Sequence, residues 1–154
     1  MAKQERIINQ LFLLAQDISP VRGARFISAI VDKSRIITYG FNQAKTHTFQ
    51  LDYNTQSRHT MLTKDLSYFR DTLEKYSFDI HSETNAIKNA IAKVGLERLA
   101  KCDIYVVRAK LEQGIFVYGN AKPCKGCSSA IESFGLNNLY YTTDAGVVER
   151  VRLK

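Results

Sequence analysis

His-Ser-Glu at 81–83 and Pro-Cys-Lys-Gly-Cys at 123–127 are the two stretches from which the fold and chemistry of this chain follow. Zinc in proteins prefers four ligands, drawn mainly from imidazole nitrogen, thiolate sulfur, carboxylate oxygen and water. His81, Cys124 and Cys127 supply three ligands and leave the fourth position to water. Because an open position is typical of catalytic rather than structural zinc, the sequence predicts a catalytic Zn²⁺ site.

Glu83 follows the histidine by two residues. That spacing is too short for a comfortable fourth ligand on the same helical turn, but it lets the carboxylate reach a water on the metal. We therefore expect Glu83 to be the general base and proton shuttle. A structural zinc with its fourth ligand elsewhere, or a redox pair of cysteines, would explain neither Glu83 nor Pro123. The candidates for such a fourth ligand are His47, His59 and Cys102.

The composition is that of an ordinary globular domain. The chain has 154 residues, 45% hydrophobic and 24% charged, which predicts one domain over 1–154 with a normal core. No apolar run approaches the roughly 20 residues that span a bilayer, and the N-terminus does not resemble a signal peptide. Three cysteines, two of them assigned to metal, indicate a reducing compartment, the cytoplasm, with Cys102 left to pack in the core.

The net charge of +7 indicates anionic partners, and the lack of a long apolar run indicates no membrane association. A nucleotide and a nucleic acid both meet this requirement, and dispersed lysines and arginines do not distinguish them. Residues 43–80 interleave aromatic with basic side chains, so we expect an insertion there that contains a helix near 64–76. This insertion could form a lid, a subunit contact or a stacking surface for single-stranded nucleic acid.

Hydrophobic periodicity predicts alternating helices and strands. Apolar residues at spacings of three and four predict a helix from 3 to about 18, which Pro20 ends. The elements expected after it are strands at 26–31 and 35–40, a helix from 80 to about 94 ended by Gly95, a strand at 103–108, a short strand at 115–118, a helix from 124 to about 134 and a strand at 138–142. The zinc ligands and Glu83 should therefore lie in the first turns of two helices.

This order of elements predicts an α/β fold. Because each of the last two main strands is joined to its neighbour through a helix, we expect both to run parallel to that neighbour by the usual crossover. The result is a mixed sheet of about five strands flanked by helices. The zinc site is expected where two helix N-termini meet over the sheet, and their partial positive charge favours an ionised carboxylate.

Beyond the ligands, the chain resembles the zinc-dependent cytidine and deoxycytidylate deaminase superfamily, most closely its deoxycytidylate deaminase-like branch. His-Ser-Glu-Thr-Asn-Ala-Ile at 81–87 is similar to that branch's His-Ala-Glu-x-Asn-Ala-Ile. The cysteine motif and the residues after it, up to Tyr140, are similar to its zinc helix and next strand. Residues 25–31 and Gly40-Phe41-Asn42 resemble its first hairpin. The likeness covers roughly 5–42 and 81–143 and leaves out 43–80.

The resemblance implies a three-layer cytidine deaminase-like fold, with His81, Cys124 and Cys127 as zinc ligands and Glu83 as proton shuttle. The residues it implies for the substrate are Asn42 for the sugar, Asn85 for the nucleotide, and the backbone around Ser82 and Lys122 for the base edge. The sequence departs from the pattern at Ser82, where Ala is usual, and at Lys122, where a small or acidic residue is common.

The resemblance also implies a hydrolase that converts a cytosine nucleotide, most of all dCMP, to the uracil nucleotide and ammonia. Arg25, with Arg22 and Lys45, is a candidate phosphate contact. Members of the superfamily commonly assemble, so a homo-oligomer is expected. The alternatives are a polynucleotide deaminase acting on tRNA adenosine or single-stranded cytosine, a guanine-type or riboflavin-type deaminase, and a catalytically idle zinc-binding interaction domain. The intact Glu83 speaks against the idle domain.

Overall fold

The computed structural model describes residues 2–21, 23–46 and 79–154. Its elements in chain order are α1 (Lys3–Gln16), β1 (Arg25–Asp32), β2 (Arg35–Phe41), β3 (Gln43–Thr46), β4 (Asp79–Ile80), α4 (Ser82–Leu99), β5 (Asp103–Glu112), β6 (Ile115–Gly119), α5 (Lys125–Ser133), β7 (Asn138–Thr142) and β8 (Val148–Arg152). The helix expected at 64–76 lies outside the described residues. No described helix is long and apolar enough to cross a bilayer.

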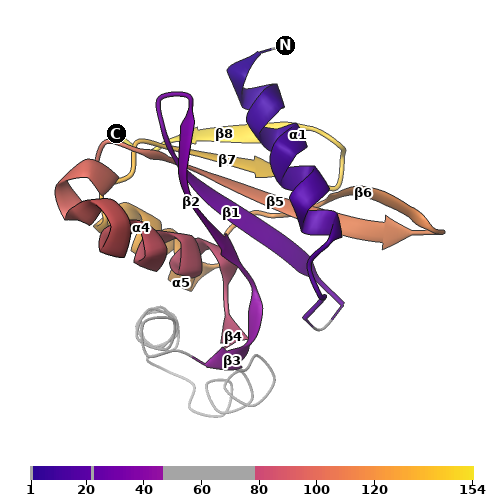
Figure 1. The fold of residues 1–154 in the computed structure, drawn as a ribbon. Helices are drawn as coiled ribbons and strands as arrows, with labels where there is room; N and C mark the ends of the chain where they lie inside the picture. The colour runs from indigo at the N-terminus through magenta and orange to yellow at the C-terminus, as the bar shows by residue number, and fades with distance from the viewer. Residues whose placement is uncertain (1, 22, 47–78) are drawn as a thin grey trace, which may run out of the picture.

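Six strands form one mixed sheet in the order β2-β1-β5-β7-β8, with β6 paired to the second half of β5 (Figure 1). Strand β5 therefore uses one edge twice, pairing its first residues with β7 and its last residues with β6. The β5–β7 pair is parallel, and the pairs β1–β2, β1–β5, β5–β6 and β7–β8 are antiparallel. The predicted mixed α/β sheet is confirmed, with one strand more than expected.

The helices lie on both faces of the sheet, as predicted (Figure 1). Successive side chains of a strand point to opposite faces. On β1, Ile27, Ala29 and Val31 contact the apolar side of α1, which includes Ile7 and Leu11. Ile30 faces the other way, into a second core made with α4 and α5. The α4 and α5 face is the one that carries the predicted metal ligands.

The strand order differs from the expected one at one place. We expected the strand after the long helix to pair in parallel with the strand before it. Strands β2 and β5 do run in the same direction, since both are antiparallel to β1, but β1 lies between them. The crossover through α4 thus spans two positions of the sheet, and among the described strands only β5–β7 is a parallel pair.

Two further differences concern the ends of helices, and a third is an additional strand. Helix α1 ends at Gln16, before the expected limit. Helix α4 breaks at Gly95, as predicted, because that residue has φ 84°, but one more turn continues to Leu99. The sequence after Asp144, interpreted as a basic tail, forms strand β8 at the sheet edge.

Gly40 is the point of closest approach between the sheet and α4. A Cβ built on this residue would meet the backbone nitrogen of Ala86 and the carbonyl oxygen of Ser82, and would lie 2.8 Å from the Ala86 Cα. Real Cβ atoms do not approach backbone this closely, so only glycine permits the contact. The first two turns of α4 therefore rest directly on the end of β2.

We expect Gly40→Ala to destabilise the protein by about 1–3 kcal/mol, because α4 must move off the sheet to make room for the methyl group. Chemical denaturation of both proteins measures the change. Gly119→Ala is the comparison variant and should cost less, because the atoms that its Cβ would meet belong to the Arg108 side chain and not to backbone. Equal stability of Gly40→Ala and the unmodified protein would contradict the tight contact.

Candidate metal centre

The three predicted ligands lie at the starts of α4 and α5. His81 is the N-cap of α4, with φ −88° and ψ 154°, and Cys124 is the N-cap of α5, with φ −67° and ψ 171°. We expected these residues inside the first turns, but both precede their helices in extended conformation. Cys127 lies in the first turn of α5, and its backbone N–H donates to the Cys124 sulfur over 3.5 Å. The C-x-x-C spacing thus puts both sulfurs on one side of the helix start.

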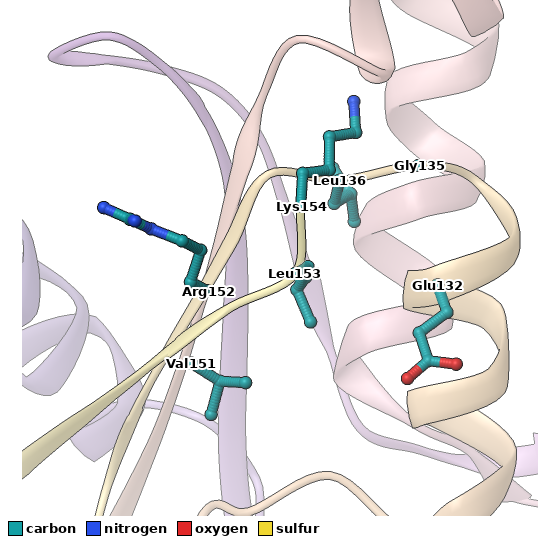
Figure 2. Close-up of a pocket in the computed structure, with 7 residues that line it drawn as sticks. All are labelled: Glu132, Gly135, Leu136, Val151, Arg152, Leu153 and Lys154. Atoms are coloured by element: carbon teal, nitrogen blue, oxygen red, sulfur yellow. The ribbon is translucent and has the colours of Figure 1, made fainter.

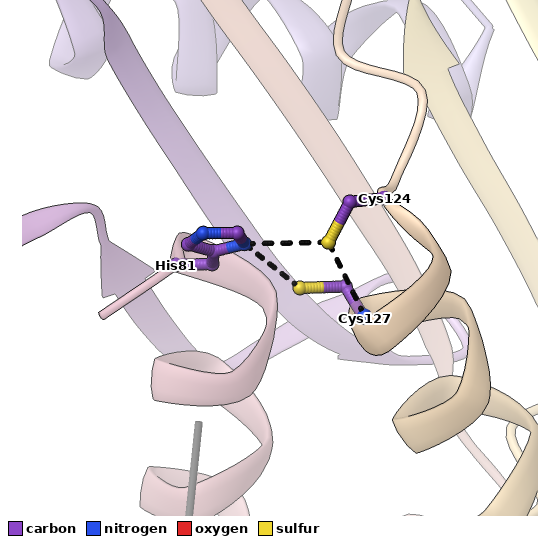
Figure 3. A group of neighbouring side chains, drawn as sticks. All are labelled: His81, Cys124 and Cys127. Atoms are coloured by element: carbon purple, nitrogen blue, oxygen red, sulfur yellow. Dashed lines mark hydrogen bonds between the residues drawn. The ribbon is translucent and has the colours of Figure 1, made fainter. Parts of the chain in front are cut away.

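The ligand atoms converge as the motif predicts (Figure 3). The Nδ1 of His81 is 3.3 Å from the Cys127 sulfur and 3.5 Å from the Cys124 sulfur, and the three ligand atoms lie within 4.8 Å of one another. A tetrahedral ion with Zn–S near 2.3 Å and Zn–N near 2.0–2.1 Å sets its N and S ligands about 3.5 Å apart. The donor set and its spacing therefore fit Zn²⁺, with Nδ1 as the imidazole ligand.

The electrostatics of Cys124 also favour a metal ligand. Hydrogen bonds from the Cys127 side chain and from His81 lower the pKa of Cys124 to about 4, although partial desolvation of the thiol by its neighbours acts in the opposite direction. The helix N-terminus also favours negative charge at this position. Cys124 is thus a thiolate at neutral pH, the form that binds metal. Cys127 is fully buried and Cys124 is exposed, so the cluster has a closed side and an open side.

Glu83 lies beside this cluster with only 6% of its surface exposed. Burial raises the pKa of its carboxyl group above the usual value, and the electrostatic interaction with His81 opposes that rise. The Ser82 hydroxyl donates to Glu83 Oε1 over 2.9 Å. A buried carboxyl group with a raised pKa is suited to both taking and giving a proton.

The two asparagines of the resemblance lie at the end of β2 and in the first turns of α4. Asn42 Oδ1 accepts the backbone N–H of Phe26, and its Nδ2 donates to the Ala24 carbonyl, both over 3.0 Å. Asn85 Oδ1 accepts the backbone N–H of Phe41 over 3.0 Å. These side chains join β1, β2 and α4 next to His81. Substrate contact by either asparagine stays a prediction.

The remaining sequence candidates lie in different places. Lys122 is exposed on the loop before Cys124, and its backbone N–H donates to Asn120 Oδ1 over 3.1 Å. Arg25 lies over the Phe116 ring, 5.2 Å from its centroid, and its Nε donates to the Ile18 carbonyl. Since Phe116 packs in the α1 core, Arg25 is on the sheet face opposite the cluster. Arg22 and the Lys45 side chain lie outside the described residues.

Arg108 is a residue that the sequence analysis missed. It pairs with Phe26 across β1 and β5, and its guanidinium lies over the Phe26 ring, 5.3 Å from the centroid. This pair is two residues along from the Ser28–Val106 pair, so Arg108 faces the α4 side of the sheet. Its Nε is buried and has no hydrogen-bond partner. The one sequence signal is a charge directly after the apolar run 104–107.

The alternatives for a structural zinc receive no support from the described residues. Cys102 is fully buried in the core below α4, where its thiol contacts the Arg98 carbonyl, and it is not part of the metal cluster. His47 and His59 lie outside the described residues. All three cysteines are free, which excludes a disulfide between Cys124 and Cys127 in this structure.

A hollow of about 420 Å³ lies at the other end of α5 (Figure 2). Glu132 and Gly135 line it on one side and the C-terminal residues Leu153 and Lys154 on the other. The Lys154 ammonium is already bonded to the Ala100 carbonyl over 2.7 Å. This hollow contains no member of the metal cluster and is separate from the chemistry at the start of α5.

Comparison with known proteins agrees with the geometry. The family model described as "Cytidine and deoxycytidylate deaminase zinc-binding region" matches residues 1–143. A dCMP deaminase from the cyanophage S-TIM5 has a similar structure, with TM-score 0.54 and 16% identity over 94% of this chain and 86% of that chain. A cytidine deaminase from Burkholderia pseudomallei is also similar, with TM-score 0.58 and 15% identity over 99% of this chain and 94% of that chain. No curated protein sequence matches the chain. The chain therefore belongs to the cytidine and deoxycytidylate deaminase family.

Proposed function

We propose that this protein is a zinc-dependent hydrolytic deaminase that converts dCMP to the uracil nucleotide and ammonia. The observation that carries the proposal is the position of Glu83, a buried carboxyl group beside the partly open cluster of His81, Cys124 and Cys127. An idle zinc-binding domain has no need of a buried carboxyl group at that position. The family membership supports the reaction class.

His81, Cys124 and Cys127 would hold the zinc, because their Nδ1 and sulfur atoms have the separations that tetrahedral Zn²⁺ requires. When bound, zinc supplies Lewis-acid chemistry that makes water a nucleophile near neutral pH. The three free cysteines fit a reducing compartment such as the cytoplasm. Homo-oligomerisation stays a prediction.

Glu83 moves the protons of the reaction. It takes a proton from the attacking water, whose oxygen bonds to C4 of the cytosine ring, and delivers it to N3. It then takes the second proton from the new C4 hydroxyl and delivers it to the exocyclic amino group. The C4–N bond breaks, ammonia leaves and a C4 carbonyl remains. One carboxyl group serves both transfers because burial raises its pKa above the usual value.

A phosphate group on the substrate would supply the anionic partner that the Arg108 side chain lacks among the described residues. This side chain is half-buried on the cluster side of the sheet and forms no ion pair with any described residue. Its strand is tied to the cysteine loop through Thr142, which accepts the Arg108 backbone N–H and donates to the Gly119 carbonyl. A guanidinium that has a buried Nε and no acidic partner among the described residues favours binding of an anionic group. The charge of +7 acts in the same direction.

Loss of a cysteine ligand should remove the metal and lower stability, because bound metal stabilises only the folded state. We expect Cys124→Ala and Cys127→Ala to purify with less than about a tenth of the zinc of the unmodified protein. Cys102→Ala is the matched control, which should lose packing but keep zinc. Metal analysis and thermal melts with and without a chelator give the result. Full zinc in Cys127→Ala would exclude that sulfur as a ligand.

Glu83→Gln should keep zinc and fold but lower kcat by about 10⁴-fold or more, because the amide cannot exchange protons. Ammonia release is measured with dCMP, deoxycytidine, cytidine, CMP, guanine, and short single-stranded DNA and RNA. Glu132→Gln, an exposed glutamate at the far end of α5, is the control and should match the unmodified enzyme. Retained turnover in Glu83→Gln would reject the proton-shuttle role.

The same substrates separate the functional alternatives. Turnover of dCMP supports the proposal, and turnover of oligonucleotides alone, with strong dependence on salt, would establish a polynucleotide deaminase instead. Turnover of guanine alone would assign a different base. Absence of turnover on all of them, in protein shown to contain zinc, would reject the proposal and favour the idle domain.

Arg108→Met should lower kcat/KM for dCMP by about 10- to 100-fold and leave that for deoxycytidine within about twofold, because a charged hydrogen bond is worth about 1.5–3 kcal/mol. Arg108→Lys should lose less. Lys110→Met is the matched control on the same strand, since Lys110 is paired with Glu112 and Asp144 on the surface. Equal losses for nucleotide and nucleoside would assign Arg108 a structural role only.

A further inference from the structure

Two buried hydroxyl groups connect the sheet to Glu83. The Oγ of Ser28, in the middle of β1, lies 2.7 Å from the Oγ of Ser82. The Ser82 hydroxyl lies 2.9 Å from Glu83 Oε1. Ser28 and Ser82 are fully buried, so no bulk water competes for these bonds. Ser28 and Ser82 are 54 residues apart in sequence, and their contact exists only because α4 lies directly on β1 and β2.

The hydrogens of the two hydroxyl groups fix the direction of the chain of bonds. A serine hydroxyl has one hydrogen to donate. Ser82 uses its hydrogen on Glu83 Oε1, which accepts when ionised. Ser28 must then donate to Ser82. The dipoles of the two hydroxyls therefore point the same way, towards the carboxylate, and each bond strengthens the next.

The Ser82 hydroxyl holds Oε1 of the carboxylate, so the orientation of the carboxylate depends on how Ser82 itself is held. Ser82 lies on the same helix as Glu83, so alone it would let the carboxylate follow any small motion of α4. Ser28 lies on a central strand that pairs on both sides. The hydrogen bond from Ser28 to Ser82 therefore fixes the position of the carboxylate relative to the sheet.

We infer that Ser28 is a positioning residue of the active site, which acts through the Ser82 hydroxyl to orient the Glu83 carboxylate for proton transfer. The inference rests on the proposed function only for its effect on turnover. The alternative is that Ser28 simply fills a polar position under α4. The two roles predict different results in one experiment. If Ser28 acts through Ser82, removing the Ser28 hydroxyl has no effect on kcat once the Ser82 hydroxyl is absent.

A double-mutant cycle measures this difference. Ser28→Ala, Ser82→Ala and the double variant are prepared with zinc, and kcat and KM are measured on the substrate that the unmodified enzyme turns over. We expect Ser82→Ala to lower kcat about tenfold or more and Ser28→Ala about two- to tenfold, with KM changed less than twofold. The double variant should be no slower than Ser82→Ala. Equal effects of Ser28→Ala in both backgrounds, or no effect in either, would overturn the inference.

Two variants control for packing. Thr38→Val removes a hydroxyl that donates to the Ala86 carbonyl of the same helix, but that hydroxyl does not contact Glu83. It should lower the melting temperature to a similar degree and leave kcat unchanged. Ser28→Thr keeps the hydroxyl and should restore kcat even if the added methyl group lowers stability. A fall in kcat in Thr38→Val as large as that in Ser28→Ala would assign both residues to helix packing.

The infrared spectrum of the carboxyl group tests the inference without turnover. The Glu83 band is the one lost in Glu83→Gln. We expect Ser28→Ala to shift this band in the unmodified background and not in Ser82→Ala. Lack of turnover in the unmodified protein with this pattern of shifts would reject the proposed reaction and retain the positioning role. Equal shifts in both backgrounds, or none, would reject the positioning role whatever the enzyme turns over.

Discussion

The contact of α4 with the end of β2 at Gly40 is the constraint on which the candidate metal centre depends. The helix rests on the sheet backbone with no side chain between them, so its start is set by the strand and not by adjustable packing. The same contact fixes the positions of His81, Ser82 and Glu83, because these residues lie at the start of the helix. Asn85 also holds this end of the helix, because its side chain accepts the backbone N–H of Phe41. The histidine ligand and the carboxylate are therefore held by backbone geometry.

The two cysteines of the candidate metal centre are held by a different kind of interaction. The N-cap of the short helix α5 holds both cysteines. The Cys124 sulfur accepts the backbone N–H of Cys127. The loop before them is fastened to β7, because the Ala121 N–H donates to the Thr142 carbonyl. The two helix N-termini bring partial positive charge to one place. That charge favours thiolate, while burial of Glu83 keeps its carboxyl group ready to hold a proton.

Local patterns were enough to predict most of the fold and the cluster of His81, Cys124 and Cys127. Helix periodicity, Pro20 and Gly95 are signals within one element, and the histidine and cysteine motifs have fixed spacing. Features made between distant segments left no such signal. The Ser28–Ser82 bond joins residues 54 apart, and Arg108 differs from a surface arginine only by its place in the sheet. Strand β8 is exposed along its whole length, so it lacks the alternation of buried residues that marks a strand. The insertion of β1 between β2 and β5 is likewise a property of the assembled sheet.

The double use of one edge of β5 has a consequence for how the chain tolerates change. The β5–β6 hairpin extends past Ala109, the last residue of β5 that pairs with β1, turns after Glu112 and returns at Gly119, whose carbonyl accepts the Thr142 hydroxyl. Its tip turns at Gln113 and Gly114, both with positive φ, and the neighbouring Ile115 is two-thirds exposed. The residues between Arg108 and Gly119 thus form a hairpin whose two ends are held in register by this pair. Added length at the tip is absorbed before the chain reaches Cys124, which makes this hairpin a natural place to join a second domain or a tag to the enzyme.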